Sequence, residues 1–370
     1  MKYPESFLKL GAVSVMAAAS LLASPLSLAE ERTLNVYNWS DYIDDAVIEE
    51  FEEASGINVN YDVFDSNEML ETKLLAGSSG YDLVVPSAYF LERQIEAGVF
   101  QKLDKDKLPN LENMWDMVEE RTAQYDPDNT YSVNYMWGTT GIGFVEEKVN
   151  EALDDAPVDS WAMIFDPEVS SKLAECGIHV LDSPSEMIPA ALKYLGLDPN
   201  DTSRDSLTKV EELFAKVRPN IQKFHSSEYI SALANGDICV AVGFSGDVFQ
   251  SQARAEEADN GVTVGYRIPK EGSQMWFDQL AIPGDANNVD EAYEFMNYLM
   301  QPKVIAKITD YVAYANGNEA SQEFVDKAIL DNPAIYPTEE TMEGLYTMKP
   351  YDAKAQRLVN RTWTKIKSGR

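Results

Sequence analysis

The sequence contains few of the residue types that most often bind transition metals. Only two histidines and two cysteines occur among its 370 residues. His179 and His225 stand in no HExxH-type spacing, and Cys176 and Cys239 form no CxxC pair. We therefore expect the histidines to be structural or surface residues, and we predict neither a metal site nor a cofactor.

Recognisable catalytic motifs are also missing. Residues 243–247 (GFSGD) look like a nucleophile elbow, but Asp247 occupies the place of the final glycine in G-x-S-x-G. Residues 141–143 (GIG) lack the third glycine of a dinucleotide-binding loop. The sequence therefore predicts a protein that catalyses no reaction. An exported hydrolase stays open as an alternative, because so many acidic residues always offer some carboxylate pair.

Positive charge is scarce. The chain has 30 basic and 62 acidic residues. The first 29 residues hold two of the basic and one of the acidic residues, which leaves 28 against 61 and a net charge of −33. Such a charge excludes nucleic acid and anionic membranes as favourable partners and attracts small cations. The alternative is an acidic surface suited to a salty habitat, unrelated to any ligand.

Long apolar runs are missing beyond the N-terminus, where none approaches the ~20 residues of a membrane-spanning helix. Residues 1–29 combine early lysines, an apolar stretch and small residues at Ser27 and Ala29, all typical of a secretory signal peptide cleaved before Glu30. We expect an exported, periplasmic protein. In that compartment Cys176 and Cys239 predict a disulfide.

The remaining 341 residues suggest about two domains. Strand-like and helix-like segments alternate along the chain, which favours an α/β fold with a mostly parallel sheet flanked by helices. No flexible linker separates two halves, so we expect the chain to cross between lobes more than once. The expected strands are residues 34–37, 57–63, 82–86, 238–242 and 280–283.

Aromatic and acidic residues gather where these strands begin or end. They are Trp39, Ser40, Asp41 and Tyr42; Ser87 and Tyr89; Phe244 and Asp247; and Trp276, Phe277 and Asp278. In open α/β sheets ligands bind at such edges. Rings and carboxylates together suit an organic ammonium, so we predict a cleft for an apolar dication or polycation. The alternative is that Asp41 caps the following helix and the rings pack in the core.

Several longer motifs support this interpretation. They are residues 37–42 (YNWSDY), 61–68 (YDVFDSNE), 81–87 (YDLVVPS), 233–240 (LANGDICV) and 314–316 (YAN). In these motifs the chain resembles the bacterial periplasmic polyamine-binding proteins, in particular the putrescine-binding members of the extracellular solute-binding family. The resemblance implies a two-lobed, type II Venus-flytrap fold, a polyamine in the interlobe cleft and delivery to an inner-membrane ABC importer. With this fold we expect lobe 1 at residues 30–138 plus 276–314 and lobe 2 at 139–275 plus 315–370, and we expect a monomer.

The resemblance also implies the ligand contacts. Asp247 and Asp278 would pair one terminal ammonium, and Ser40, Asp41 and Glu186 would face the other end. Three rings, those of Trp39, Phe244 and Trp276, would enclose the aliphatic chain. The full set of implied contacts is Trp39, Ser40, Asp41, Tyr42, Ser87, Glu186, Asp247, Trp276, Asp278 and Tyr314.

The pocket departs from the pattern of either subgroup. Tyr89 and Trp276 resemble the residues found in spermidine-preferring members, whereas Ser87 and Asp247 resemble those of putrescine-binding members. We therefore expect putrescine, spermidine or both. Alternatives are a polyamine-sensing adaptor for a membrane receptor, or another small solute. An amino acid is disfavoured because no arginine stands at the strand ends to pair its carboxylate.

Overall fold

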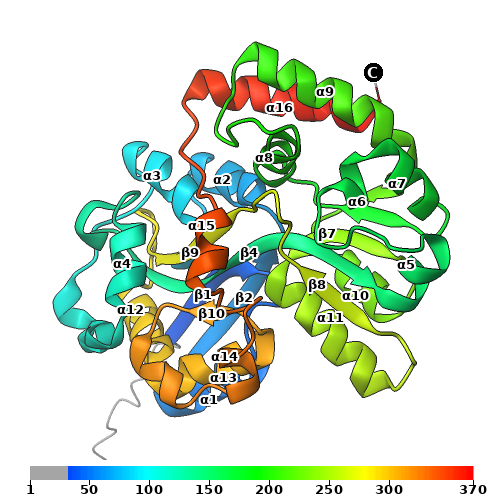
Figure 1. The fold of residues 1–370 in the computed structure, drawn as a ribbon. Coiled ribbons are helices and arrows are strands. Elements are labelled where there is room, and N and C mark those ends of the chain that lie inside the picture. Colours follow the sequence, from blue (N-terminus) through cyan, green and yellow to red (C-terminus); the bar gives the residue numbers. More distant parts are fainter. Residues whose placement is uncertain (1–31, 370) are drawn as a thin grey trace, which may run out of the picture. The chain divides into compact units, whose positions relative to one another are not determined.

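A computed structural model describes residues 32–369, and its strands form one mixed sheet (Figure 1). The sheet order is β2-β1-β3-β9-β4-β7-β5-β6, with β8 and β10 also paired to β4. The predicted signal peptide lies outside the described residues. The strands are β1 Arg32–Trp39, β2 Ile57–Phe64, β3 Leu83–Val84, β4 Ser132–Val145, β5 Ile178–Val180, β6 Lys223–Phe224, β7 Val240–Phe244, β8 Val264–Arg267, β9 Met275–Ala281 and β10 Ala315–Asn316.

Helices connect and cover these strands, as expected of an α/β chain. The α-helices are α1 Asp45–Ser55, α2 Asn67–Leu75, α3 Ala88–Glu96, α4 Asp116–Thr122, α5 Glu146–Ala152, α6 Ala162–Phe165, α7 Pro167–Leu173, α8 Pro184–Tyr194, α9 Arg204–Val217, α10 Tyr229–Ala234, α11 Ser245–Ala258, α12 Val289–Leu299, α13 Pro302–Val312, α14 Lys327–Leu330, α15 Glu339–Gly344 and α16 Ala353–Ser368. Short 3₁₀ turns are η1 Lys105–Lys107, η2 Pro109–Asn113, η3 Pro127–Asn129, η4 Arg218–Asn220 and η5 Glu319–Glu323.

The long strand β4 joins the two halves of the sheet. Its first part pairs with β9, and its second part pairs with β7 and β8, all antiparallel. The outer strands are parallel: β1 pairs with β2 and β3, and β5 pairs with β6 and β7. All fourteen residues of β4 are buried. Figure 1 shows β4 passing from the side of β9 to the side of β7.

Two large hydrophobic cores lie on either side of this crossing. The first draws on residues between 34 and 137 and between 275 and 315, together with Ile335 and Met348. The second draws on residues between 142 and 266, together with the buried face of α16. Strand β4 contributes Trp137 to the first core and Ile142 to the second. The lobe boundaries at 138/139, 275/276 and 314/315 stay a prediction.

The N-terminus of helix α1 contradicts the alternative interpretation in which Asp41 caps this helix. The helix is capped by Asp44, whose carboxylate accepts from the Ala46 amide, and Asp41 lies three residues earlier. Gly56 ends the helix with φ 69°, in the left-handed region that glycine adopts without strain. The same alternative placed the two rings of the 39–42 segment in the core, and there Tyr42 is indeed buried, with Trp39 packed against that core.

Strand β9 corrects a second expectation. The sequence predicted a strand over 280–283, preceded by Trp276 and Asp278, but β9 spans Met275–Ala281. Asp278 therefore lies inside a fully buried strand and not at its edge. An acidic residue in such a place needs hydrogen-bond donors, because burial without partners is costly.

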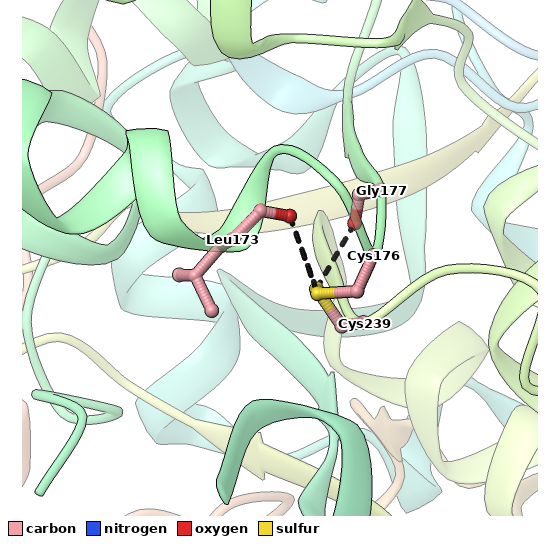
Figure 2. Close-up of a disulfide and its surroundings, with 4 residues drawn as sticks. All are labelled: Leu173, Cys176, Gly177 and Cys239. Atoms are coloured by element: carbon pink, nitrogen blue, oxygen red, sulfur yellow. Dashed lines mark hydrogen bonds between the residues drawn. A yellow bond between two sulfur atoms is a disulfide. The ribbon is translucent and has the colours of Figure 1, made fainter. Parts of the chain in front are cut away.

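The predicted disulfide is present. Cys176, just after α7, is bonded to Cys239, just before β7 (Figure 2). The two Cα atoms are 5.5 Å apart, within the usual range for a bridge. The sulfur of Cys239 lies close to the carbonyl oxygens of Leu173 and Gly177, so the bond fixes the α7–β5 turn against β7.

Removing this bond is expected to reduce stability without altering the ligand site. The bridge spans 63 residues, and closing a loop of that length restricts the unfolded chain by about 4 kcal/mol in the entropic model. Replacing both Cys176 and Cys239 with alanine should therefore lower the free energy of unfolding by about 2–5 kcal/mol in urea titrations. A matched affinity measurement should show no change, and an unchanged urea midpoint would contradict the prediction.

Candidate ligand-binding site

A cleft that is partly open to solvent lies where segments from both cores meet. Its walls hold all the sequence-predicted contacts except Asp41 and Tyr89. They also hold Asp65, Asn67 and Ser226, which the sequence did not single out. The lining residues are Trp39, Ser40, Tyr42, Asp65, Asn67, Ser87, Glu186, Ser226, Phe244, Asp247, Trp276, Asp278 and Tyr314.

Asp278 projects from β9 and is held by two hydroxyl groups. Ser87, the residue before α3, donates to Oδ1 at 2.5 Å, and the Tyr42 hydroxyl donates to Oδ2 at 2.9 Å. Asp278 is 3 % exposed. Burial raises the pKa of its carboxyl to about 7, although both hydroxyl donors favour the ionised form. A buried carboxylate of this kind is ready to pair with a cation.

Asp247 has a similar environment in the first turn of α11. The Tyr229 and Tyr314 hydroxyls donate to its two oxygens, each at 2.6 Å. Burial raises its pKa to about 7 against these two donors. The ring centroids of Tyr42 and Tyr314 are 5.0 Å apart. The two tyrosines that hold Asp278 and Asp247 are therefore in direct contact.

Glu186, in the first turn of α8, is the third buried carboxylate. Thr140 donates to Oε2 at 2.6 Å, and Oε1 accepts from Tyr89 at 3.1 Å and from the Gln274 amide at 3.0 Å. Burial raises the pKa of Glu186 to about 8, and the negative charges of Glu68 and Asp278 contribute in the same direction. Full ionisation of this carboxyl at neutral pH therefore requires a compensating positive charge.

Aromatic rings form the apolar wall between these acids. Phe244 is the central ring: its centroid lies 5.9 Å from that of Trp39 and 5.6 Å from that of Trp276, with both pairs edge to face. Trp276 in turn contacts Tyr314 at 5.4 Å. Trp39 is anchored by its indole N–H, which donates to the Val85 carbonyl. Such faces hold methylene groups and attract cations.

The described part of the cleft wall carries one sign of charge. Its ionisable residues are Asp65, Glu186, Asp247 and Asp278 together with tyrosines, and none of the residues that line it is lysine, arginine or histidine. An anionic or zwitterionic ligand would leave its own negative charge unpaired there. A ligand with several positive charges and an apolar body is the complementary chemistry.

Tyr89, a predicted contact, lies behind the cleft wall. It is 6 % exposed, and its hydroxyl contacts Glu186 and Asn67. The structure thus makes Tyr89 a partner of a lining carboxylate. The sequence marked Asp65 and Asn67 only as part of the 61–68 motif, although they follow the aromatic end of β2 at Phe64 and so match the pattern of the other strand ends. Ser226 lies on an irregular segment after β6 that gives no periodic signal.

Asp41 also points away from the cleft. Its carboxylate forms an ion pair with Arg254 of α11 at 2.6 Å, with both side chains more than 30 % exposed. Its backbone φ is 54°, a left-handed conformation that turns the chain between Trp39 and Tyr42. This observation does not support the direct ligand contact that the resemblance implied for Asp41.

Replacing Asp41 with asparagine is therefore expected to have a small effect on binding. Exposed ion pairs contribute about 0–1 kcal/mol, so affinity should fall by less than about fivefold in calorimetry. Gln250 donates to the backbone carbonyl of Asp41, a contact that the substitution retains. A loss of affinity as large as that expected for replacing a buried carboxylate would instead indicate that Asp41 contacts the ligand.

Comparison with known proteins identifies the family of this chain. The sequence matches the family model of bacterial extracellular solute-binding proteins over residues 46–338. It is 53% identical to the putrescine-binding periplasmic protein SpuD of Pseudomonas aeruginosa, covering 95% of this chain and 96% of the relative. It is 52% identical to the putrescine-binding periplasmic protein PotF of Escherichia coli, covering 97% of this chain and 98% of the relative.

A solved structure extends the likeness to the fold. It is that of the spermidine/putrescine ABC transporter substrate-binding protein PotD from Streptococcus pneumoniae, with a TM-score of 0.71 and 29% identity, covering 91% of this chain and 99% of that chain. This confirms the predicted two-lobed binding-protein fold class. Within residues 32–369, no helix has the length and apolar composition needed to cross a membrane. The chain belongs to the family of bacterial extracellular solute-binding proteins.

Proposed function

We propose that this protein binds a polyamine, putrescine or spermidine, in the cleft and delivers it to an ABC importer. The observation that carries the proposal is the composition of the cleft wall, which combines buried carboxylates with aromatic rings and has no basic side chain among the lining residues. Each terminal ammonium would restore the ionised form of carboxylates whose pKa burial has raised.

The ligand is proposed to lie along the rings, with its two ends at different acids. The contact between Tyr42 and Tyr314 supports Asp278 and Asp247 as partners of one ammonium. Glu186, which is held by Thr140, would serve the other end with Ser40. Ring faces would contribute about 0.5–2 kcal/mol for each cation–π contact.

We relate the preferred length of the ligand to Trp276 and Tyr89, the two residues that match the pattern of spermidine-preferring members of the family. Trp276 lines the cleft, whereas Tyr89 lies behind Glu186 and acts on the ligand only through that carboxylate. We therefore propose that Trp276, with Phe244, sets the space available to the aliphatic chain. Tyr89 would instead tune the charge at the far end.

Export, delivery and the role as a binder form the rest of the proposal. The relatives named above are periplasmic binding proteins, and the structural neighbour is a transporter's substrate-binding protein. We propose that this chain acts in the periplasm as a monomer without a reaction of its own. Closure of the lobes around the ligand would be a hinge motion.

Isothermal titration calorimetry tests the proposal. The purified protein, first unfolded and refolded to remove co-purifying ligand, would be titrated with putrescine, spermidine, cadaverine and a panel of amino acids. We expect micromolar or tighter binding of at least one polyamine and no binding of amino acids. Failure of every polyamine to bind would refute the proposed function. Mass spectrometry of the ligand released on unfolding would identify the bound species independently.

A further inference from the structure

Asn67, the first residue of α2, connects two of the acidic ends of the cleft; the sequence placed it in the 61–68 motif but assigned it no role. Its side chain is 4 % exposed and lines the cleft wall. The amide nitrogen donates to the hydroxyl of Ser87 at 2.9 Å and to the hydroxyl of Tyr89 at 3.3 Å. The Ser87 hydroxyl in turn contacts Asp278, and the Tyr89 hydroxyl contacts Glu186.

The orientation of this amide is fixed by the backbone. Its oxygen accepts from the Ser87 N–H at 3.0 Å, and a backbone N–H can only donate. The amide nitrogen must therefore face Ser87 Oγ and Tyr89 OH. Each of these oxygens accepts one amide proton, so its own single proton is available for a carboxylate.

The two branches then run in the same direction. Ser87 donates onward to Asp278 at 2.5 Å, and this is the contact that its hydroxyl proton makes. Tyr89 has two candidates, Glu186 at 3.1 Å and the Ser185 hydroxyl at 3.4 Å. The carboxylate is both nearer and more polar, so the tyrosine proton goes to Glu186.

We propose that Asn67 is the positioning residue of the binding site: one side-chain amide orients a donor toward Asp278 and another toward Glu186, and so prepares both carboxylates for cationic groups of the ligand. This inference rests on the proposed function. A neutral residue would thus contribute to the recognition of positive charge at both ends of the ligand. Because one amide holds both hydroxyls, the two ends are prepared together.

Replacement of Asn67 with leucine, which is similar in size, tests the proposal. We expect putrescine affinity to fall about tenfold or more, since both hydroxyls lose the contact that orients their protons. In a background that already carries Ser87→Ala and Tyr89→Phe, the same substitution should change affinity by less than about twofold. Such non-additivity is the signature of residues that act through one another.

A control separates this role from a loss of stability. Asn318 is also a buried asparagine, 2 % exposed, with its amide donating to the Met300 carbonyl and its oxygen accepting from the Ser321 N–H. It does not line the cleft. Asn318→Leu should lower the thermal midpoint while leaving affinity within about twofold. An additive effect of Asn67→Leu in the Ser87→Ala, Tyr89→Phe background would overturn the proposal.

A second variant keeps the test valid should Asn67→Leu fail to fold. Asn67→Asp preserves size and the bond from the Ser87 N–H, but its carboxylate only accepts, so it would draw hydroxyl protons away from Asp278 and Glu186. Simple electrostatics predicts tighter binding of a cation by the added charge, whereas donor orientation predicts weaker binding. Weaker binding supports the proposal, and equal or tighter binding overturns it.

The wild-type titration separates the two levels of failure. If the unaltered protein binds no polyamine, the proposed function fails and this inference falls with it. If the unaltered protein binds but neither Asn67 variant changes affinity, only the role of Asn67 is overturned.

Discussion

Replacing Asp278 with asparagine is expected to weaken polyamine binding by at least ~2 kcal/mol, about 30-fold, because it leaves a buried ammonium without its counter-charge. The substitution also disturbs the two donors. Ser87 and Tyr42 both direct hydroxyl protons at this side chain, and an amide nitrogen at either position cannot accept one of them. Calorimetry with putrescine and spermidine measures the loss directly.

The matched control is Asp290→Asn. Asp290 lies in the first turn of α12 and forms an exposed ion pair with Lys107 at 2.6 Å. It carries the same charge but has no contact with the cleft, so its replacement should leave affinity unchanged. If Asp278→Asn binds as tightly as the control, Asp278 is not part of the ligand site. The comparison also removes the contribution of overall net charge, which both variants change equally.

The strand ends at Trp39 and Phe244 were predictable because the apolar residues of β1 and β7 stand out in the sequence directly before them. Both rings lie in the cleft. The long strand β4 was missed because it is buried along its whole length and interrupted by glycines at 138, 141 and 143. A strand without a solvent face shows no alternation, so its sequence carries no period to detect.

The missed site residues share a different physical cause. Asn67 acts through Ser87 and Tyr89, which lie 20 and 22 positions away along the chain, and no local spacing indicates such contacts. For Asp41 the family resemblance implied a ligand contact, whereas in the structure the residue has a left-handed backbone and pairs with Arg254. Sequence patterns indicated the strand ends, but side-chain direction depends on the folded backbone.

Affinity for polyamines is expected to rise with pH between 5 and 8. In the free protein burial raises the pKa of Asp247 and Asp278 to about 7 and that of Glu186 to about 8. A bound ammonium favours the ionised carboxylates, so binding releases protons. Each released proton contributes about a tenfold rise in affinity per pH unit. The ligand keeps its charge through this range, since alkyl ammonium groups titrate near 10.

Other charges around these carboxyls change their pKa values but not the direction in which polyamine affinity changes with pH. Asp41 raises and Arg254 lowers the pKa of Asp247, and Glu68 raises that of Glu186. Calorimetry in two buffers of different ionisation enthalpy counts the protons released at each pH. Asp278→Asn should remove about one proton from that count near pH 6, whereas Asp290→Asn should remove none. A pH-independent affinity from 5 to 8 would show that the three carboxyls are already ionised in the free cleft.

The same three groups predict the opposite trend for the stability of the free protein. Their folded pKa values lie above those of the unfolded chain, so between about pH 4 and 8 the folded state binds more protons. The contribution of these three groups to the free energy of unfolding therefore falls as pH rises through this range. Ligand binding reverses that loss, because the ammonium groups compensate the ionised carboxylates. The difference between the thermal midpoints of the free and the polyamine-saturated protein should consequently increase from pH 5 to pH 8. An unchanged difference over this range would contradict the prediction.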